Sequence, residues 1–203
     1  QFLDLAGTRV TSAAVASIAA LADLEHLAVY SFDDAALKDL GNLTKLRVLW
    51  VESSPGVTDA GAHVLASFPH LESLCFSRTG IGDRALAHLV SPSGLRDLGL
   101  WNTGVTDAGL EQVAGMTNLV ELDIRETKVT SAGLRHLAGL KSLEKLELPE
   151  GVIVSPQALR LVAQMPNVPL QELDLHPTES NPVTEEYLAQ LPLLRNLKTL
   201  SIN

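Results

Sequence analysis

Aromatic residues, cysteines and long apolar segments are all scarce in this sequence of 203 residues. Phe, Trp and Tyr together make up 4% of the chain, so an aromatic side chain on an exposed strand face is more informative than usual. The single cysteine, Cys75, has no partner for an internal disulfide and cannot build a zinc cluster, so the fold must depend on packing. No apolar run approaches the roughly 20 residues that cross a bilayer, so we expect a soluble chain without a membrane partner.

Basic residues are also in deficit, which argues against nucleic acid as a partner. The chain has 15 Lys and Arg against 24 Asp and Glu, a net charge of −9. Such a charge would repel a phosphate backbone unless basic side chains gathered on one face. The sequence starts at Gln1 with no initiator Met and no signal segment, as it would after removal of a leader, tag or preceding domain. The compartment stays open, with a slight preference for the cytoplasm.

The dominant feature of the sequence is an internal repeat. The segments LGLWNTGVTDAGLEQVAGMTN and LDIRETKVTSAGLRHLAGLKS are successive copies, and units open 24 residues apart at Leu95, Leu119 and Leu143. The L-x-x-L-x-L signature returns at Leu24, Leu46, Leu71, Leu170 and Leu197. With a partial strand at residues 2–5, the chain carries nine strand signals separated by 22 to 27 residues.

Each unit changes its apolar period halfway. In the L-x-x-L-x-L half, apolar and variable positions alternate with period two, which predicts a strand with one buried face. In the second half Leu110, Val113 and Ala114 follow helical spacing, as do Leu134 and Leu137. Each unit therefore predicts a strand, a turn, a helix and a return.

The stretch NTGVTDAGL at 102–110 resembles either a phosphate- or metal-binding loop or the start of a helix. Its Thr106 aligns with Thr11, Asp33, Thr58, Gly82, Thr130, Ser155 and Thr184, most of which can accept a hydrogen bond at a helix N-terminus. An acid or a proline follows in most copies, and small residues such as Gly61, Gly109 and Gly133 stand three positions after the cap. A ligand loop occurs once, whereas this motif recurs, so we interpret it as a helix cap.

The period and the L-x-x-L-x-L signature resemble the leucine-rich repeat over essentially the whole chain. The form LxxLxLxxTxVTDAGLxxLAGLxx resembles bacterial, planctomycete-type repeats and is similar to the cysteine-containing repeats of F-box receptors. Thr79, Thr103 and Thr127 stand where the latter place Asn or Cys, and no F-box segment is present. The resemblance implies an α/β fold: a right-handed solenoid, or horseshoe, with a concave parallel sheet, convex helices and a protein-binding role without catalysis or a cofactor.

The predicted organisation is a single domain over residues 1–203 with about eight repeats. No single unit can bury both its strand and its helix, whereas stacked units share one continuous core. The sequence opens within a strand signal and closes with another, LKTLSIN, so neither end carries a recognisable cap. We therefore expect the chain to be an excerpt of a longer protein or to have lost its caps.

The variable strand positions are expected to point into the concavity, where specificity should lie. In its N-terminal half this face presents Tyr30, Trp50 and Trp101 as aromatic anchors beside the small residues Cys75 and Ser77. The alternative for the tryptophans is packing against side chains at the rim.

In its C-terminal half the same face is acidic. The carboxylates are Asp97, Glu121, Asp123, Glu147, Glu172 and Asp174, tempered by Arg125 and Lys145. Like charges on adjacent strands destabilise a sheet, so this acidic ladder favours a protein partner with a basic surface. The alternative is a solvated face that simply carries the charge of an acidic protein. The longer spacing after Leu170 adds a candidate contact loop from His176 to Pro182.

Catalysis and metal binding receive little support. Asp123 and Glu147 could form a paired-carboxylate hydrolase site, and the acidic ladder could collect a hard cation, but no loop supplies dense oxygen ligands. His63, His88 and His136 spread over the helical surface, which disfavours a shared metal. We predict a protein-binding scaffold, with a structural spacer between domains as an alternative and a cation-dependent binder or hydrolase as a weaker one. The oligomeric state is left open.

Overall fold

Nine parallel strands form one continuous sheet in which sequence order and spatial order agree. We analysed a computed structural model, which describes residues 1–5, 8, 10–89, 94–150, 152, 156–163, 169–175 and 182–202. The strands of the sheet are β1 (Phe2–Asp4), β2 (His26–Tyr30), β3 (Val48–Glu52), β5 (Ser73–Cys75), β7 (Asp97–Gly99), β8 (Glu121–Asp123), β9 (Lys145–Glu147), β10 (Glu172–Leu175) and β11 (Thr199–Ile202). These are the nine strand positions that the repeat predicts.

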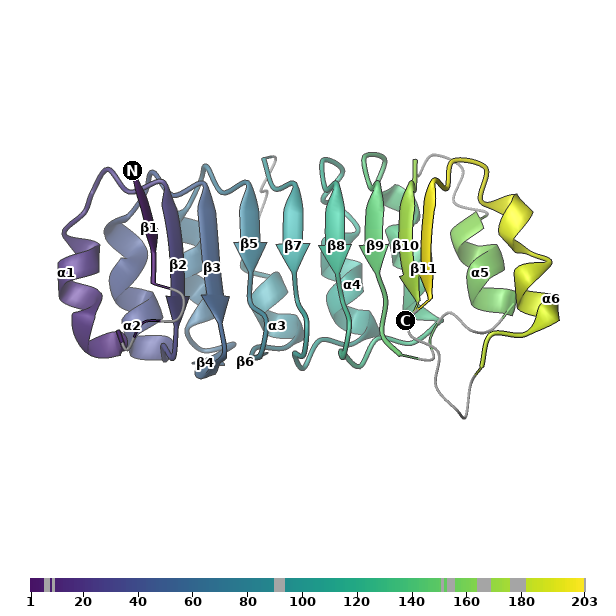
Figure 1. Cartoon of the computed structure of the whole chain (residues 1–203). Helices are drawn as coiled ribbons and strands as arrows, with labels where there is room; N and C mark the ends of the chain where they lie inside the picture. The colour runs from purple at the N-terminus through teal and green to yellow at the C-terminus, as the bar shows by residue number, and fades with distance from the viewer. Residues whose placement is uncertain are drawn as a thin grey trace.

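The helices lie behind the sheet in a second layer (Figure 1). The α-helices are α1 (Val15–Ala19), α2 (Asp34–Asp39), α3 (Asp83–Leu86), α4 (Asp107–Val113), α5 (Pro156–Ala163) and α6 (Glu185–Leu188). The 3-10 helices are η1 (Ser12–Ala14), η2 (Leu40–Asn42), η3 (Ala62–Ser67), η4 (Gly133–Gly139) and η5 (Leu191–Leu193). The connection between strands is thus a short α-helix in some repeats and a 3-10 helix alone in others. We call the sheet face opposite the helices the open face.

The core lies between the two layers and follows the leucine positions of the repeat. The middle residue of a strand, such as Leu74, Leu98 or Leu122, is buried against the helices, while its two neighbours are only half-buried. This alternation is the period-two pattern of the sequence. Leu110 and Leu134 close the core from the helix layer.

The predicted helix caps form in several repeats. Thr106 Oγ1 accepts a hydrogen bond from the amide of Ala108, and Asp33 and Thr184 cap α2 and α6 in the same way. Gly82 has no hydroxyl, and there the Asp59 carboxylate of the preceding repeat accepts from the Gly82 amide instead. Ser155 lies outside the described residues.

The acid after each cap has a second role that the sequence did not indicate. Asp83 Oδ1 and Oδ2 accept hydrogen bonds from the amide and hydroxyl of Thr106, the cap residue of the next repeat, at 2.8 and 2.7 Å. Asp107 accepts from Thr130 in the same way, at 2.7 Å for both bonds. Asp34 holds Thr58 likewise. The recurring T-D-A-G motif therefore links consecutive repeats as well as starting helices.

The glycine of the motif makes room for this carboxylate. A Cβ on Gly109 would lie 2.5 Å from Asp83 Oδ1 and 2.7 Å from Val105 Cγ1. Gly133 faces Asp107 in the same crowded arrangement. In the last repeat the corresponding residue is Tyr187, and the preceding unit carries Pro156, which has no carboxylate, at the acid position. The small residues three positions after the cap therefore let a carboxylate of the preceding repeat approach the helix closely.

The chain leaves β2, β3, β5, β7 and β8 through a turn that the sequence did not predict in detail. Ser31, Ser53, Arg78, Asn102 and Glu126 occupy equivalent positions and all have positive φ, between 46 and 56°. Such a conformation is uncommon for residues other than glycine. In three of these turns a threonine hydroxyl donates to the carbonyl three residues earlier, at Thr79, Thr103 and Thr127. A short second sheet, β4 (Ser54–Thr58) with β6 (Thr79–Gly80), follows two of the strands.

Candidate binding surface

The open face consists of aligned rows of side chains, and their register is the one that the repeat predicts. The first row, from pairings along the sheet, is His26, Val48, Ser73, Asp97, Glu121, Lys145, Glu172 and Thr199. The middle row is Asp4, Ala28, Trp50, Cys75, Gly99, Asp123, Glu147, Asp174 and Ser201. The outer row includes Tyr30, Glu52, Ser77, Trp101 and Arg125, whose turns are joined by backbone hydrogen bonds.

Trp50 is the exposed tryptophan of this face; Phe2, which pairs with His26 on the end strand β1, is also exposed. Trp50 lies in β3, and 42% of its surface is accessible. Its indole Nε1 donates a hydrogen bond to Ser73 Oγ on the neighbouring strand at 3.1 Å, so the polar edge of the ring is satisfied while the ring remains exposed. A large aromatic group held in one orientation loses little freedom on binding, which suits it to be an anchor.

Trp101 differs from the expected exposed anchor because two arginines cover its ring. The guanidinium carbon of Arg78 lies 4.4 Å from the ring centroid and that of Arg125 lies 5.6 Å from it. Both distances are within the range of cation–π attraction. Trp101 is consequently half-buried. This arrangement matches the alternative given above for the tryptophans, which is packing against side chains at the rim.

Tyr30 is half-buried at the outer end of β2. Burial and the neighbouring carboxylate of Glu52 raise its pKa above the usual value, so its phenol stays neutral at physiological pH. Tyr30 is therefore a smaller and less open aromatic surface than Trp50.

A hollow of about 360 Å³ lies on the open face and is lined by residues from β3 to β9. Its floor is formed by Cys75 and Gly99, two small residues of the middle row, and Trp50 lines it from β3. A Cβ on Gly99 would lie 3.0 Å from Cys75 Sγ, so the glycine helps to keep this hollow open. The remaining lining includes Glu52, Ser73, Ser77, Asp97, Glu121, Asp123, Arg125 and Glu147.

Cys75 is a free thiol at the floor of the hollow. Its Sγ lies 3.0 Å from the Oγ of Ser77, which is itself buried. Burial raises the pKa of the Cys75 thiol, so the nucleophilic thiolate is disfavoured. The thiol is thus a lining group of the hollow rather than an activated nucleophile.

The middle of the acidic ladder is an ion-pair network. Arg125 Nη2 lies 2.7 Å from Asp123 Oδ2, and Arg125 Nε lies 2.8 Å from Glu147 Oε2. Lys145 Nζ pairs with Glu147 Oε1 at 2.9 Å and also with Glu121. Burial disfavours the Lys145 ammonium, but these two carboxylates outweigh it and raise its pKa. Asp123 and Glu147, the pair considered for hydrolysis, are therefore both engaged by the same arginine.

Asp97 lies at the edge of this network. Glu121 and Asp123 form ion pairs within the described part of the chain, whereas Asp97 forms none there. Burial and the charge of Glu121 raise the pKa of the Asp97 carboxyl, which means that its charge is poorly compensated. The hollow thus has excess negative charge on the side opposite Trp50.

The C-terminal end of the ladder is less defined. Glu172 is exposed and Asp174 half-buried, both on β10. His176 and the predicted contact loop up to residue 181 lie outside the described residues.

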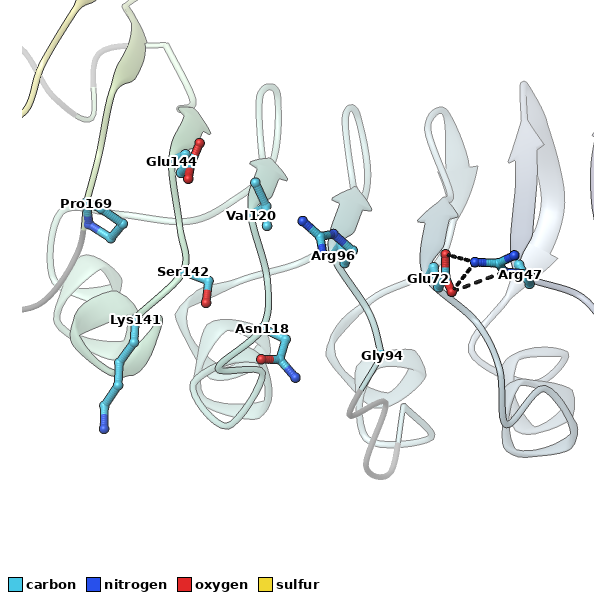
Figure 2. Close-up of a pocket in the computed structure, with 10 residues that line it drawn as sticks. All are labelled: Arg47, Glu72, Gly94, Arg96, Asn118, Val120, Lys141, Ser142, Glu144 and Pro169. Atoms are coloured by element: carbon cyan, nitrogen blue, oxygen red, sulfur yellow. Dashed lines mark hydrogen bonds and ion pairs between the residues drawn. The ribbon is translucent and has the colours of Figure 1, made fainter.

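A second, larger hollow of about 820 Å³ lies at the edge of the sheet where the strands begin (Figure 2). Arg47 and Glu72 form a two-pronged ion pair at its end, with Nη2 at 2.7 and 2.9 Å from the two carboxylate oxygens. Beyond them, Arg96 lies just before β7 and Glu144 just before β9, with Val120 before β8 between the two, and Lys141 extends away from the sheet. Sequence reasoning missed this groove because its residues come from a few rim positions that recur in several repeats. Its charges are mixed in sign, which gives it no preference for one class of ligand.

Two further observations concern metal binding and membrane-spanning helices. Within the described ranges, no three His, Cys, Asp or Glu side chains come together in a way that could hold a metal ion. In the same part of the chain, every helix is too short or too polar to cross a membrane.

The strand–turn–helix units, stacked in sequence order with a leucine core and one open sheet face, define a leucine-rich-repeat solenoid. The chain belongs to this family: a family described as "Leucine-rich repeat region" matches residues 1–165. Leucine-rich repeats commonly serve as scaffolds for protein–protein interaction. No curated protein matches the chain in sequence.

Solved structures share this fold over most or all of the chain. Internalin C2 of Listeria monocytogenes is 24% identical with a TM-score of 0.65, and the match covers 100% of this chain and 80% of that one. Internalin F of the same organism is 21% identical with a TM-score of 0.59, over 92% and 65% of the two chains. A leucine-rich repeat protein of Leptospira interrogans is 19% identical with a TM-score of 0.62, over 99% and 48%. At these identities the likeness concerns the fold alone.

Proposed function

We propose that the protein is a non-catalytic scaffold that binds a protein partner through the open face of its sheet. The observation that carries the proposal is Trp50, an indole fixed by its hydrogen bond to Ser73 yet 42% exposed, in a chain with two tryptophans in all. Exposing a large aromatic side chain to water is unfavourable, and such residues gather where a partner covers them.

The surroundings of Trp50 support the same proposal. The hollow over Cys75 and Gly99 offers space for a partner side chain directly beside the indole. The carboxylates around it provide charge that steers a basic surface toward this face and fixes its orientation. A spacer that only separates other domains would need neither feature.

The test compares capture of proteins from a lysate of the source organism by three forms of the chain. These are the native protein, Trp50→Ala, and Leu161→Ala as a control. Leu161 in α5 is 37% exposed, close to the exposure of Trp50, but it belongs to the helix layer. Circular dichroism establishes that all three are folded.

A partner retained by the native and Leu161→Ala forms but lost by Trp50→Ala is the expected result. Equal capture by all three forms, or loss with Leu161→Ala alone, would reject the open face as the binding surface. In that case the helix layer or the spacer role becomes the better account.

A further inference from the structure

The two tryptophans of the open face differ in one respect that points to the chemistry of the partner. Arg125 lies over the ring of Trp101 and at the same time binds Asp123 through two hydrogen bonds, Nε to Oδ1 at 3.0 Å and Nη2 to Oδ2 at 2.7 Å. In the described part of the chain, no cation lies over Trp50. The molecule thus contains one indole–guanidinium–carboxylate stack and one indole without a guanidinium.

A carboxylate that could bind a cation over Trp50 lies in the same hollow. Trp50 on β3 and Asp97 on β7 line the same hollow, with β5 between them. The residues of β5 that face the hollow are small, Ser73 and Cys75. Neighbouring strands are about 4.8 Å apart, so β3 and β7 are separated by about 9.6 Å. Trp50 belongs to the middle row and Asp97 to the first row, but the indole reaches toward the first row, where its Nε1 donates to Ser73 Oγ, and Ser73 pairs with Asp97. A cation within about 6 Å of a ring centroid and about 2.8 Å from a carboxylate oxygen spans a comparable distance.

The charge of the hollow favours a cationic guest. Five carboxylates line it, those of Glu52, Asp97, Glu121, Asp123 and Glu147, and Arg125 is the one basic side chain among the lining residues. Lys145 pairs with two of these carboxylates from the side, which leaves an excess of three negative charges. Burial, and after it the charge of Glu121, raises the pKa of the Asp97 carboxyl, and a guest cation would stabilise its charged form.

From this juxtaposition we propose that the hollow accepts an arginine side chain from an extended segment of the partner protein, with its guanidinium between the Trp50 ring and the Asp97 carboxylate. Arginine fits better than lysine because its planar group stacks on an indole while its N–H groups bind a carboxylate in two-pronged fashion. Trp101, Arg125 and Asp123 show the same combination within the chain. The proposal rests on the proposed function, since it names what the partner presents to the same face.

The experiment selects binders for the native chain from a displayed library of random 12-residue peptides. The selected peptides are then measured against four forms: native, Trp50→Ala, Asp97→Asn and, as a matched loss of one carboxylate, Glu72→Gln. Glu72 belongs to the rim groove and pairs with Arg47, outside the hollow. Each selected arginine is also replaced by citrulline, which has the same shape without the charge. A Trp50→Phe variant keeps an aromatic face in case Trp50→Ala lowers stability.

The expected peptides share an arginine, and citrulline in its place weakens binding by about tenfold or more, as loss of a charge-assisted hydrogen bond does. Asp97→Asn and Trp50→Ala weaken binding comparably, Trp50→Phe less, and Glu72→Gln leaves it unchanged.

Three other results would overturn the arginine site, and they differ in what they say of the open face. Peptides that lose affinity with Trp50→Ala but tolerate both citrulline and Asp97→Asn would overturn the arginine site while supporting the open face as a binding surface. Peptides indifferent to Trp50→Ala would count against the open face, and with it against the arginine site. A selection without enrichment of arginine would also overturn the arginine site.

Discussion

The carboxylate of Asp107 accepts hydrogen bonds from both the backbone amide and the hydroxyl of Thr130, which lies one repeat further along the chain. Asp83 holds Thr106 in the same way. These contacts join residues that are 23 positions apart and fix the start of one helix to the start of the next. In a solenoid, stability is a sum over repeats and their interfaces, so each such contact contributes to the coupling between neighbours.

Replacing Asp107 by alanine should therefore lower the stability of the whole array. The substitution leaves the Thr130 amide and hydroxyl without their acceptor, and we expect a loss of about 1–3 kcal/mol in the free energy of unfolding. Urea unfolding followed by circular dichroism measures it. Asp39→Ala, at an exposed position near the end of α2, should change stability by less than about 0.5 kcal/mol. Equal effects of the two substitutions would contradict the role of Asp107.

Gly109→Ala should destabilise the chain even though alanine is the better helix former by about 1 kcal/mol. The new Cβ would meet Asp83 Oδ1 at 2.5 Å. Gly115→Ala is the control, because nothing lies within 4 Å of its Cβ position. In the double variant Asp83→Ala, Gly109→Ala the clash with the carboxylate is gone. The stability lost in the double variant should therefore be smaller than the sum of the losses in the two single variants. Strict additivity in thermal unfolding would show that the carboxylate and the glycine are independent.

Tyr187→Phe should preserve or raise stability. The Tyr187 hydroxyl is buried and has no hydrogen-bond partner among the described residues, so its removal costs no bond there. Burial raises the Tyr187 pKa above its ordinary value near 10. The folded state then holds its proton to higher pH than the unfolded state, so stability falls as the pH rises past about 10. Unfolding curves at pH 8 and pH 10.5 should show a smaller loss for Tyr187→Phe than for the native chain.

Arg125→Met should weaken the C-terminal half of the open face. Glu147, which is 6% exposed, would lose one of its two cationic partners, and the Trp101 ring would lose a covering group. We expect a loss of about 1–3 kcal/mol in the free energy of unfolding together with a red shift of tryptophan fluorescence as the indole meets water. An unchanged emission spectrum would show that Arg125 does not shield Trp101.

The fold and the rows of the open face could be predicted because they depend on local periods. Leu98 and Leu122 repeat at fixed spacing, and that spacing alone sets which side chains share a face and a row. The helix caps follow from Thr106 and its counterparts for the same reason.

The contacts that could not be predicted from the sequence depend on distances between repeats. The bond from Asp107 to Thr130 requires that the helix layer bring the two together, which a period does not reveal. Trp101 is covered by Arg78 because that residue occupies a turn with positive φ after the preceding strand. The sequence likewise places Arg125 and Lys145 within the acidic ladder, but the period does not show that each of them pairs with two carboxylates.

The central claim is that a partner protein covers the open face at Trp50, and crosslinking in the source organism tests it most directly. A photoreactive amino acid is placed either at Val48, beside Trp50 on the open face, or at Lys38, exposed on α2 in the helix layer. We predict a discrete crosslinked protein from position 48 that disappears when Trp50 is also replaced by alanine, and none from position 38. Crosslinks from position 38 with none from position 48 would contradict the claim.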